Sequence, residues 1–175
     1  MFKTMVIMLL VVLAALLLYV TTKPDTFRIQ RSSTIKAPPE KIFPLINDFH
    51  RWVSWSPYEK KDPTMKRTYS GAADGKDSVY EWDGDQNVGQ GRMEIIESTP
   101  PSKIAIKLDF MKPFEAHNIA EFTLQRGAET TDVTWSMQGP LSYAAKIIHL
   151  FFDMDRMVGK DFEAGLANLK ALAEN

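Results

Sequence analysis

The hydrophobic positions along the chain divide it into regions with different periods, and the first region is apolar on every helical face. An uncharged stretch of 19 residues (4–22) would reach about 28 Å as a helix, close to the hydrocarbon thickness of a bilayer. Lys3 and Lys23 bracket this stretch, and Tyr19 stands where interfacial aromatic residues occur. The pattern predicts one N-terminal transmembrane helix.

A cleaved signal peptide is the competing interpretation of the same segment, because it also combines a short basic start with an apolar middle. The apolar run is long and no Ala-x-Ala-like site follows it. We therefore favour an uncleaved anchor over residues 1–22 and a polar linker over residues 23–26. Lys3 favours a cytoplasmic N-terminus, whereas several basic residues after the span argue the other way. We expect a single-pass membrane protein with its soluble domain on the extracytoplasmic side.

After the linker, alternation and turn residues predict a strand followed by short helices. Residues 27–36 alternate in polarity, and the Ala-Pro-Pro-Glu sequence that follows ends this strand. Pro39 suits the first turn of a helix. A second, shorter helical turn then carries Trp52 and Trp55.

Between residues 65 and 138, apolar residues recur at every second position. Tyr80 and Trp82 share one strand face, and Trp135 and Met137 share another. Such alternation, interrupted by Gly and Pro turns, predicts about six further strands of a half-buried antiparallel sheet.

The last region, about residues 141–173, predicts one long helix. Its apolar residues recur in steps of three or four, so that one stripe faces the core. The complete order predicts an α+β domain over residues 27–175, in which a curved antiparallel sheet of about seven strands wraps around a long C-terminal helix.

Composition and motifs exclude several kinds of chemistry. The chain has 21 basic and 22 acidic residues with no charge cluster, so it lacks the electrostatic footprint of nucleic-acid binding. It has no cysteine, its three histidines lack metal-ligand spacing, and no phosphate-loop or dinucleotide fingerprint is present. We expect no metal site, no cofactor and no catalytic residue. Glu115 and His117 share a strand face, which we interpret as solvated; an acid/base pair in a cavity is the alternative.

Aromatic and methionine side chains form the remaining candidate site. They fall on predicted inner faces or near the mouth of the sheet, where each alone would be an ordinary core residue. As a set they indicate an apolar ligand cavity, because Met adapts to irregular ligands and buried Trp and Tyr need polar partners. The candidate lining residues are Trp52, Trp55, Tyr69, Tyr80, Trp82, Met93, Phe110, Phe114, Trp135, Met137, Phe151 and Met154.

Several short runs resemble the SRPBCC superfamily, the START and birch-pollen-allergen-like helix-grip fold, and its polyketide cyclase/dehydrase-type branch. The resemblance covers about residues 27–172. The matching runs are residues 31–43 (Arg-Ser-Ser-Thr-Ile-Lys-Ala-Pro-Pro-Glu-Lys-Ile-Phe), Asn47-Asp48-Phe49, Trp55-Ser56-Pro57-Tyr58, Tyr80-Glu81-Trp82, Gly89-Gln90-Gly91, Val133-Thr134-Trp135 and residues 161–166 (Asp-Phe-Glu-Ala-Gly-Leu).

The resemblance implies a cavity between helix and sheet that holds an apolar or amphipathic ligand. With the predicted anchor, it implies a membrane-anchored domain that binds a lipid or another hydrophobic small molecule. Two alternatives remain open at this stage: a cyclase- or dehydratase-like enzyme that uses the same cavity, and a co-chaperone-like module that docks a protein through the sheet or the Trp52–Trp55 region.

Overall fold

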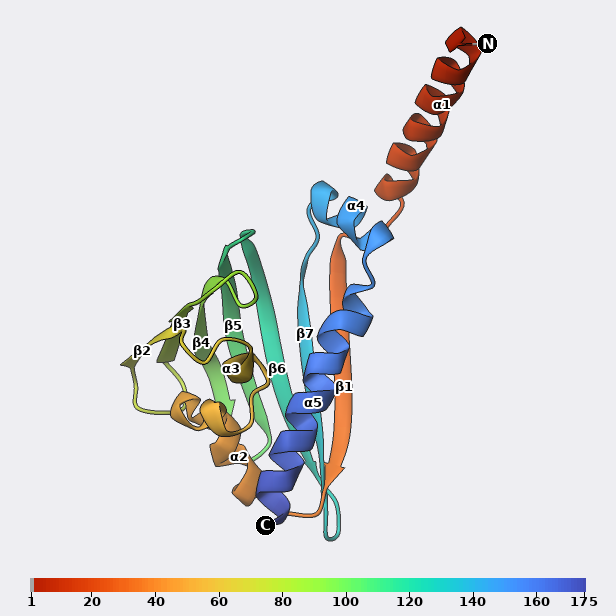
Figure 1. Cartoon of the computed structure of the whole chain (residues 1–175). Coiled ribbons are helices and arrows are strands. Elements are labelled where there is room, and N and C mark those ends of the chain that lie inside the picture. Colours follow the sequence, from red (N-terminus) through yellow and green to blue (C-terminus); the bar gives the residue numbers. More distant parts are fainter. Residues whose placement is uncertain (1) are drawn as a thin grey trace.

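The computed structural model describes residues 2–175, and within them it contains one antiparallel sheet of seven strands (Figure 1). The strand order is β1-β7-β6-β5-β4-β3-β2, so the first strand forms one edge of the sheet and pairs with the last strand. The strands are β1 (Thr26–Ile35), β2 (Lys66–Gly71), β3 (Ser78–Asp83), β4 (Gln90–Thr99), β5 (Lys103–Lys112), β6 (Ala116–Arg126) and β7 (Thr131–Pro140). This confirms the predicted curved antiparallel sheet.

Four helices, α2, η1, α3 and α5, lie on one face of this sheet. Three short ones connect β1 to β2: α2 (Pro39–Asn47), the 3-10 helix η1 (Phe49–Ser54) and α3 (Tyr58–Lys61). The sequence pattern did not predict α3. The C-terminal helix α5 (Met154–Glu174) crosses the sheet in front of β1 and β7 (Figure 1). Together these elements make the helix-grip architecture.

The alternating pattern of the strands confirms the predicted inner faces. Tyr80 and Trp82 of β3 are buried, whereas Glu81 between them is only half-buried. Trp135 and Met137 of β7 are buried on the same side of the sheet as α5. Side chains alternate across a strand, so one register places most of the large apolar residues toward the helices.

The predicted single helix over residues 141–173 is wrong in one respect: it is two helices, α4 (Tyr143–Phe151) and α5. Phe152 adopts an extended conformation between them. The Asp153 carboxylate then accepts a hydrogen bond of 2.9 Å from the Arg156 amide and caps the start of α5. Apolar residues recur through the break at near-helical steps, so the hydrophobic pattern alone could not reveal it.

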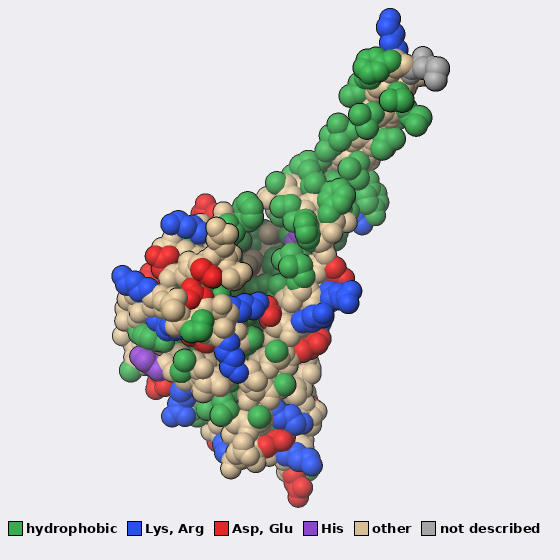
Figure 2. Space-filling view, in the orientation of Figure 1, with side chains coloured by type: hydrophobic (Ala, Val, Ile, Leu, Met, Phe, Trp, Pro, Cys, Tyr) green, Lys and Arg blue, Asp and Glu red, His purple; other side chains and the backbone are tan. Residues whose placement is uncertain are grey.

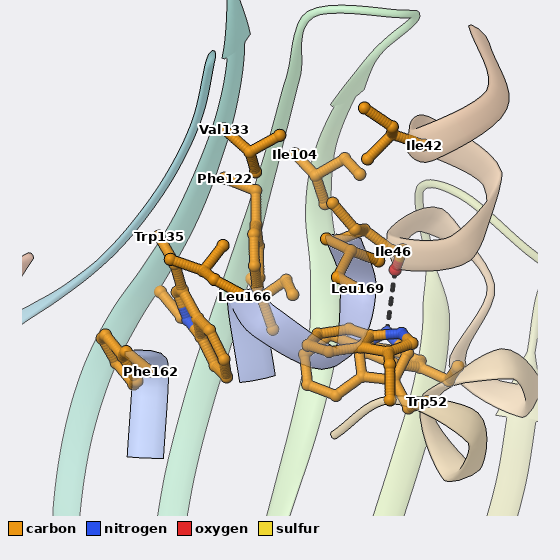
Figure 3. Packing of buried hydrophobic residues seen from close by; sticks show 14 of the residues in the cluster. Ile42, Ile46, Trp52, Ile104, Phe122, Val133, Trp135, Phe162, Leu166 and Leu169 are labelled. Carbon is orange, nitrogen blue, oxygen red and sulfur yellow. Dashed lines mark hydrogen bonds between the residues drawn. The ribbon is translucent and has the colours of Figure 1, made fainter. Parts of the chain in front are cut away.

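The centre of the core is an aromatic stack between sheet and helix (Figure 3). The rings of Trp135 and Phe162 lie nearly parallel with centroids 4.1 Å apart, and Phe122 stacks at 4.9 Å on Trp135. A Cβ at Gly165 of α5 would lie 2.7 Å from the Trp135 ring. Glycine at this position therefore permits the close approach of helix and sheet.

The N-terminal helix α1 (Phe2–Thr21) projects away from the domain (Figure 1). It is long and apolar enough to cross a membrane, and nearly all of its side chains are exposed. A signal sequence near an N-terminus would meet the same description. The first strand begins at Thr26, one residue before the predicted start of the domain.

Candidate functional site

A cavity of about 190 Å³ lies between the sheet, α5 and the segment that contains η1 and α3. Most of its wall is aromatic or aliphatic. The lining residues are Trp52, Ser56, Tyr58, Glu59, Met65, Tyr80, Trp82, Val88, Met93, Leu108, Phe110, Ala120, Trp135, Met137, Val158, Asp161 and Phe162. Strands β3 to β7 each contribute inward-facing side chains to this wall, because all of them present one face to α5.

Seven of the predicted candidate residues line this cavity. They are Trp52, Tyr80, Trp82, Met93, Phe110, Trp135 and Met137. Periodicity located them, since each of the six strand residues lies on the inner face of its strand.

The other five candidates lie elsewhere. Trp55 is fully buried in the core beside the cavity, and Tyr69 of the edge strand β2 is half-buried against the ring of His50. Phe114 is 74% exposed in the β5–β6 connection, and Phe151 is 69% exposed on α4. Met154 borders a different hollow. Phe114 and Phe151 therefore do not lie on an inner face: the chain turns at the first, and the second lies at the end of α4.

That second hollow, of about 440 Å³, is larger but lies at the outer surface between the start of β1 and the α4–α5 junction. Exposed residues such as Phe152, Asp153 and Asp155 form part of its border. A shallow, partly charged surface of this kind encloses a ligand less completely than the inner cavity does. We therefore take the smaller cavity as the candidate binding site.

The buried indole groups differ in how their N–H donors are used. Trp52 donates to the carbonyl of Ile46 at 2.9 Å (Figure 3), and Trp82 donates to Val88 at 3.0 Å. The Nε1 of Trp135, which lines the cavity, is the only buried side-chain nitrogen or oxygen without a hydrogen-bond partner among residues 2–175. An unpaired buried donor costs free energy, so an acceptor that reached this N–H would be favoured.

A buried polar network that the sequence did not predict borders the same cavity. The Glu59 carboxylate accepts hydrogen bonds from the Tyr80 hydroxyl at 2.6 Å and from Arg67 Nε at 2.7 Å. Burial, followed by this bond to Glu59, raises the pKa of Tyr80 well above its ordinary value. Both oxygens of Glu59 are thus engaged, and Tyr80 stays a neutral hydrogen-bond donor.

Two further polar residues complete the wall near α5. Burial raises the pKa of Tyr58, with a smaller contribution from the nearby carboxylate of Asp161. Asp161 itself forms an ion pair with Lys61 at 2.6 Å. The cavity therefore combines an apolar body with a few polar groups, of which the Trp135 indole is unpaired.

The histidine and glutamate pair considered from the sequence lies outside the cavity. His117 and Glu115 have exposed side chains, and His117 Nδ1 lies 2.7 Å from Asp109 on the outer side of the sheet. This geometry excludes the pair as an acid/base centre inside the cavity. Across residues 2–175, His, Asp and Glu form no group of three that could hold a metal ion.

The Trp52–Trp55 region does not form an exposed docking surface. Both side chains are at least 96% buried, and the Trp55 indole donates to the Leu45 carbonyl at 2.8 Å. Their rings pack against each other and against Phe122. The structure thus removes the Trp52–Trp55 surface from the protein-docking alternative.

Comparison with known proteins agrees with this architecture. Residues 26–174 match the family model described as polyketide cyclase/dehydrase and lipid transport. The chain belongs to this family. It has the polyketide cyclase/dehydrase-like fold that binds hydrophobic ligands, as the sequence runs indicated. No curated protein sequence matches the chain significantly.

Solved structures with this fold share little sequence with the chain. Protein CV1439 from Chromobacterium violaceum superposes with a TM-score of 0.60 at 17% identity, covering 87% of this chain and 99% of its own. The Aha1 dimer from Colwellia psychrerythraea superposes with a TM-score of 0.60 at 16% identity, covering 85% of this chain and 96% of its own. The di-domain ARO/CYC protein BexL from the BE-7585A biosynthetic pathway gives 0.62 at 12% identity, covering 90% of this chain and 53% of BexL. At these identities the likeness establishes the fold.

Proposed function

We propose that this protein is a membrane-anchored binding domain for a lipid or another hydrophobic small molecule, which it holds in the cavity between the sheet and α5. The observation that carries the proposal is the apolar cavity, whose lining includes Trp135 with its unpaired N–H. An apolar pocket with few polar groups suits a ligand with an apolar body and a single acceptor.

The volume of the cavity limits what it encloses. A cavity of about 150 Å³ holds benzene, whereas pockets for drug-sized ligands start at about 300 Å³. At about 190 Å³, the cavity accommodates one ring or a short segment of an acyl chain. A longer lipid would leave part of its length outside.

The helix α1 supports the membrane part of the proposal. Retained as an anchor, it keeps the cavity next to the lipid phase, in which hydrophobic ligands concentrate. We propose that the domain lies on the extracytoplasmic side, because a short N-terminal tail with a signal-like start leaves the following domain outside.

Native mass spectrometry of the full chain in lipid nanodiscs tests the proposal. We expect bound hydrophobic molecules to remain on the protein after release from the nanodisc. Quenching of tryptophan fluorescence by a brominated fatty acid provides an independent readout, since Trp52, Trp82 and Trp135 line the cavity. An unliganded mass together with unquenched fluorescence would contradict the proposal.

A cyclase- or dehydratase-like activity in the same cavity is the second candidate, because Glu59 and Asp161 bring carboxylates to the wall. Binding is favoured over this activity since both oxygens of Glu59 already accept hydrogen bonds and Asp161 is paired with Lys61. The test is incubation with a linear polyketide chain. Turnover that Glu59→Gln abolishes while ligand affinity is retained would favour the enzyme.

A further inference from the structure

Helix α4 buries its charged side chain and exposes apolar ones, which is the reverse of an ordinary surface helix. Its one charged residue, Lys146, is buried, whereas Ile148 and Phe151 are 43% and 69% exposed. Ala144, one turn before Ile148, is exposed as well, so that an apolar stripe faces away from the domain. A soluble domain normally buries such a stripe, and an exposed one indicates a contact surface.

The buried lysine ties α4 to the point where the chain leaves α1. Lys146 Nζ donates to the carbonyl of Lys23 at 2.9 Å and pairs with the carboxylate of Asp25. The hydroxyl of Tyr143 donates to the carbonyl of Leu17 at 2.9 Å, and Val20 of α1 is fully buried. α4 is therefore packed on the last turns of α1.

This contact sets the depth of α4 relative to the apolar span. Leu17 precedes the end of α1 at Thr21 by four residues, which corresponds to about 6 Å along a helix axis. Amphipathic helices that lie in a membrane interface bury their apolar face by about 5–10 Å. A bilayer that surrounds α1 therefore also reaches α4.

The exposed apolar surface continues from α1 over α4 to the rest of this end of the domain. Figure 2 shows hydrophobic side chains along α1 that extend without interruption onto the domain at its base. The exposed large apolar residues beyond α1 at this end are Tyr143, Ile148, Phe151, Phe152 and Met157, with Met111 and Phe114 around the β5–β6 connection.

Strand register places the β5–β6 connection and α4 at the same end of the sheet. Near the start of β6, Ile119 pairs with Gln138 of β7, shortly before α4, and Ala116 pairs with Phe110 of β5, shortly before the connection. Figure 1 shows both at the end that carries α1. The cavity residues Val88 and Phe110 come from this end as well.

From these observations we propose that α4 and the β5–β6 connection form an apolar rim that inserts into the lipid bilayer and turns the cavity toward its acyl chains. The inference rests on the proposed function, because it takes α1 to be a membrane anchor. The occupant of the α4 stripe is the acyl region, because the one charged side chain of α4 is already paired with Asp25. The exposed charges of the connection, Lys112 and Glu115, lie close to Phe114, and in this proposal they stay at the level of the headgroups. Insertion of this kind is insensitive to salt.

The chain has no cysteine, so single-cysteine variants label one site each. We would reconstitute the full chain in phosphatidylcholine vesicles with an NBD fluorophore at Ile148→Cys or Phe151→Cys. The matched control is Ala128→Cys, an exposed position in the β6–β7 turn at the opposite end of the sheet. Leu10→Cys reports on α1.

We expect blue-shifted emission and loss of intensity with doxyl-labelled lipids at positions 148, 151 and 10, unchanged between low and high salt, and water-like emission at position 128. Water-like emission at 148 and 151 with a quenched label at 10 would overturn the rim and leave the anchor intact. Water-like emission at position 10 would overturn the anchor, and the rim with it. A label at 128 that is quenched like the others would also overturn the inference, because the domain would then contact lipid at both ends.

Discussion

The hydroxyl of Tyr80 donates a hydrogen bond of 2.6 Å to the buried carboxylate of Glu59, 21 positions earlier in the chain. Glu59 lies on the one-turn helix α3, and Tyr80 lies on the inner face of β3. Arg67 from the neighbouring strand β2 neutralises the carboxylate, so the cavity wall carries a complete polar network. We expect the stability of the domain to depend on this network.

Replacement of Glu59 by glutamine tests that dependence. Glu59→Gln keeps an acceptor for Tyr80 but removes the negative charge that Arg67 requires. We expect the free energy of unfolding to fall by about 1–3 kcal/mol, less than for a fully buried ion pair because the Arg67 side chain is 21% exposed. Urea denaturation measures the change. Glu129→Gln, at an exposed turn position, is the matched control and should be near neutral; an equal loss in both variants would contradict the prediction.

Gly165→Ala should be destabilising although alanine favours helices. Its Cβ would lie 3.1 Å from Pro57 and 2.7 Å from the Trp135 ring, which is held in the core by stacking on Phe122 and Phe162. We expect a loss of about 1–3 kcal/mol in thermal or urea unfolding.

Gly159→Ala, six residues earlier on α5, is the control. Its Cβ would meet the guanidinium of Arg31, the far end of a flexible side chain. The gain in helix propensity of about 1 kcal/mol offsets the weakened surface ion pairs of Arg31. A Gly159→Ala protein less stable than Gly165→Ala would show that rigid packing against Trp135 does not govern this helix.

Filling the cavity should abolish ligand binding without loss of the fold. Ala120 of β6 lines the cavity, so Ala120→Phe places a ring in the space a ligand would occupy. Ile119→Phe changes the adjacent residue, which points to the opposite face. We expect quenching by the brominated fatty acid to disappear only in Ala120→Phe, with unchanged circular dichroism in both. Retained quenching in Ala120→Phe would locate binding outside the cavity.

The unpaired Trp135 N–H should select ligands with a hydrogen-bond acceptor. An aryl ketone such as acetophenone should bind more tightly than ethylbenzene, which has a similar shape and no acceptor. One neutral hydrogen bond of about 0.5–1.5 kcal/mol corresponds to a preference of about two- to tenfold. Titration calorimetry measures both ligands. The preference should vanish in Trp135→Phe; if it persists, another group on the wall donates the bond.

His117 should titrate above the ordinary value for histidine. Its hydrogen bond to Asp109 is the main cause of the raised pKa, and Glu115 adds to it. Because the folded-state pKa is raised, the stabilising contribution is complete below the unfolded pKa of 6.5 and is lost as the pH rises through the folded value. NMR titration of the His117 ring protons measures the shift. Asp109→Asn should return the pKa toward 6.5, and an unchanged titration curve would exclude Asp109 as the cause.

The strand content and the inner faces could be predicted from the sequence, as Trp82 and Met137 illustrate. A strand alternates its side chains with a period of two whatever lies around it, so the pattern survives without knowledge of the fold. Asp153 shows the limit of the same reasoning. The apolar pattern runs through residues 141–173 at helical steps, and only the extended conformation of Phe152 and the cap by Asp153 divide the segment.

The polar part of the site was beyond prediction for a different reason. Glu59 sits in a charged run, Glu59-Lys60-Lys61-Asp62, which in the sequence has the composition of a solvated surface. Its burial follows from Arg67 and Tyr80, which reach it from two different strands. Contacts of this kind between distant segments produce no periodic pattern in the amino-acid sequence.

By itself, the sequence determined the family, the alternation that builds the sheet, and the apolar helix at the N-terminus, because each of these rests on local pattern. The tertiary structure decided which aromatic residues enclose a cavity, which indole N–H is left unpaired, and that α4 turns its apolar stripe outward against α1. These features depend on where the chain turns and which segments meet, and a hydrophobic residue has the same identity in the sequence whether it faces the core or the lipid.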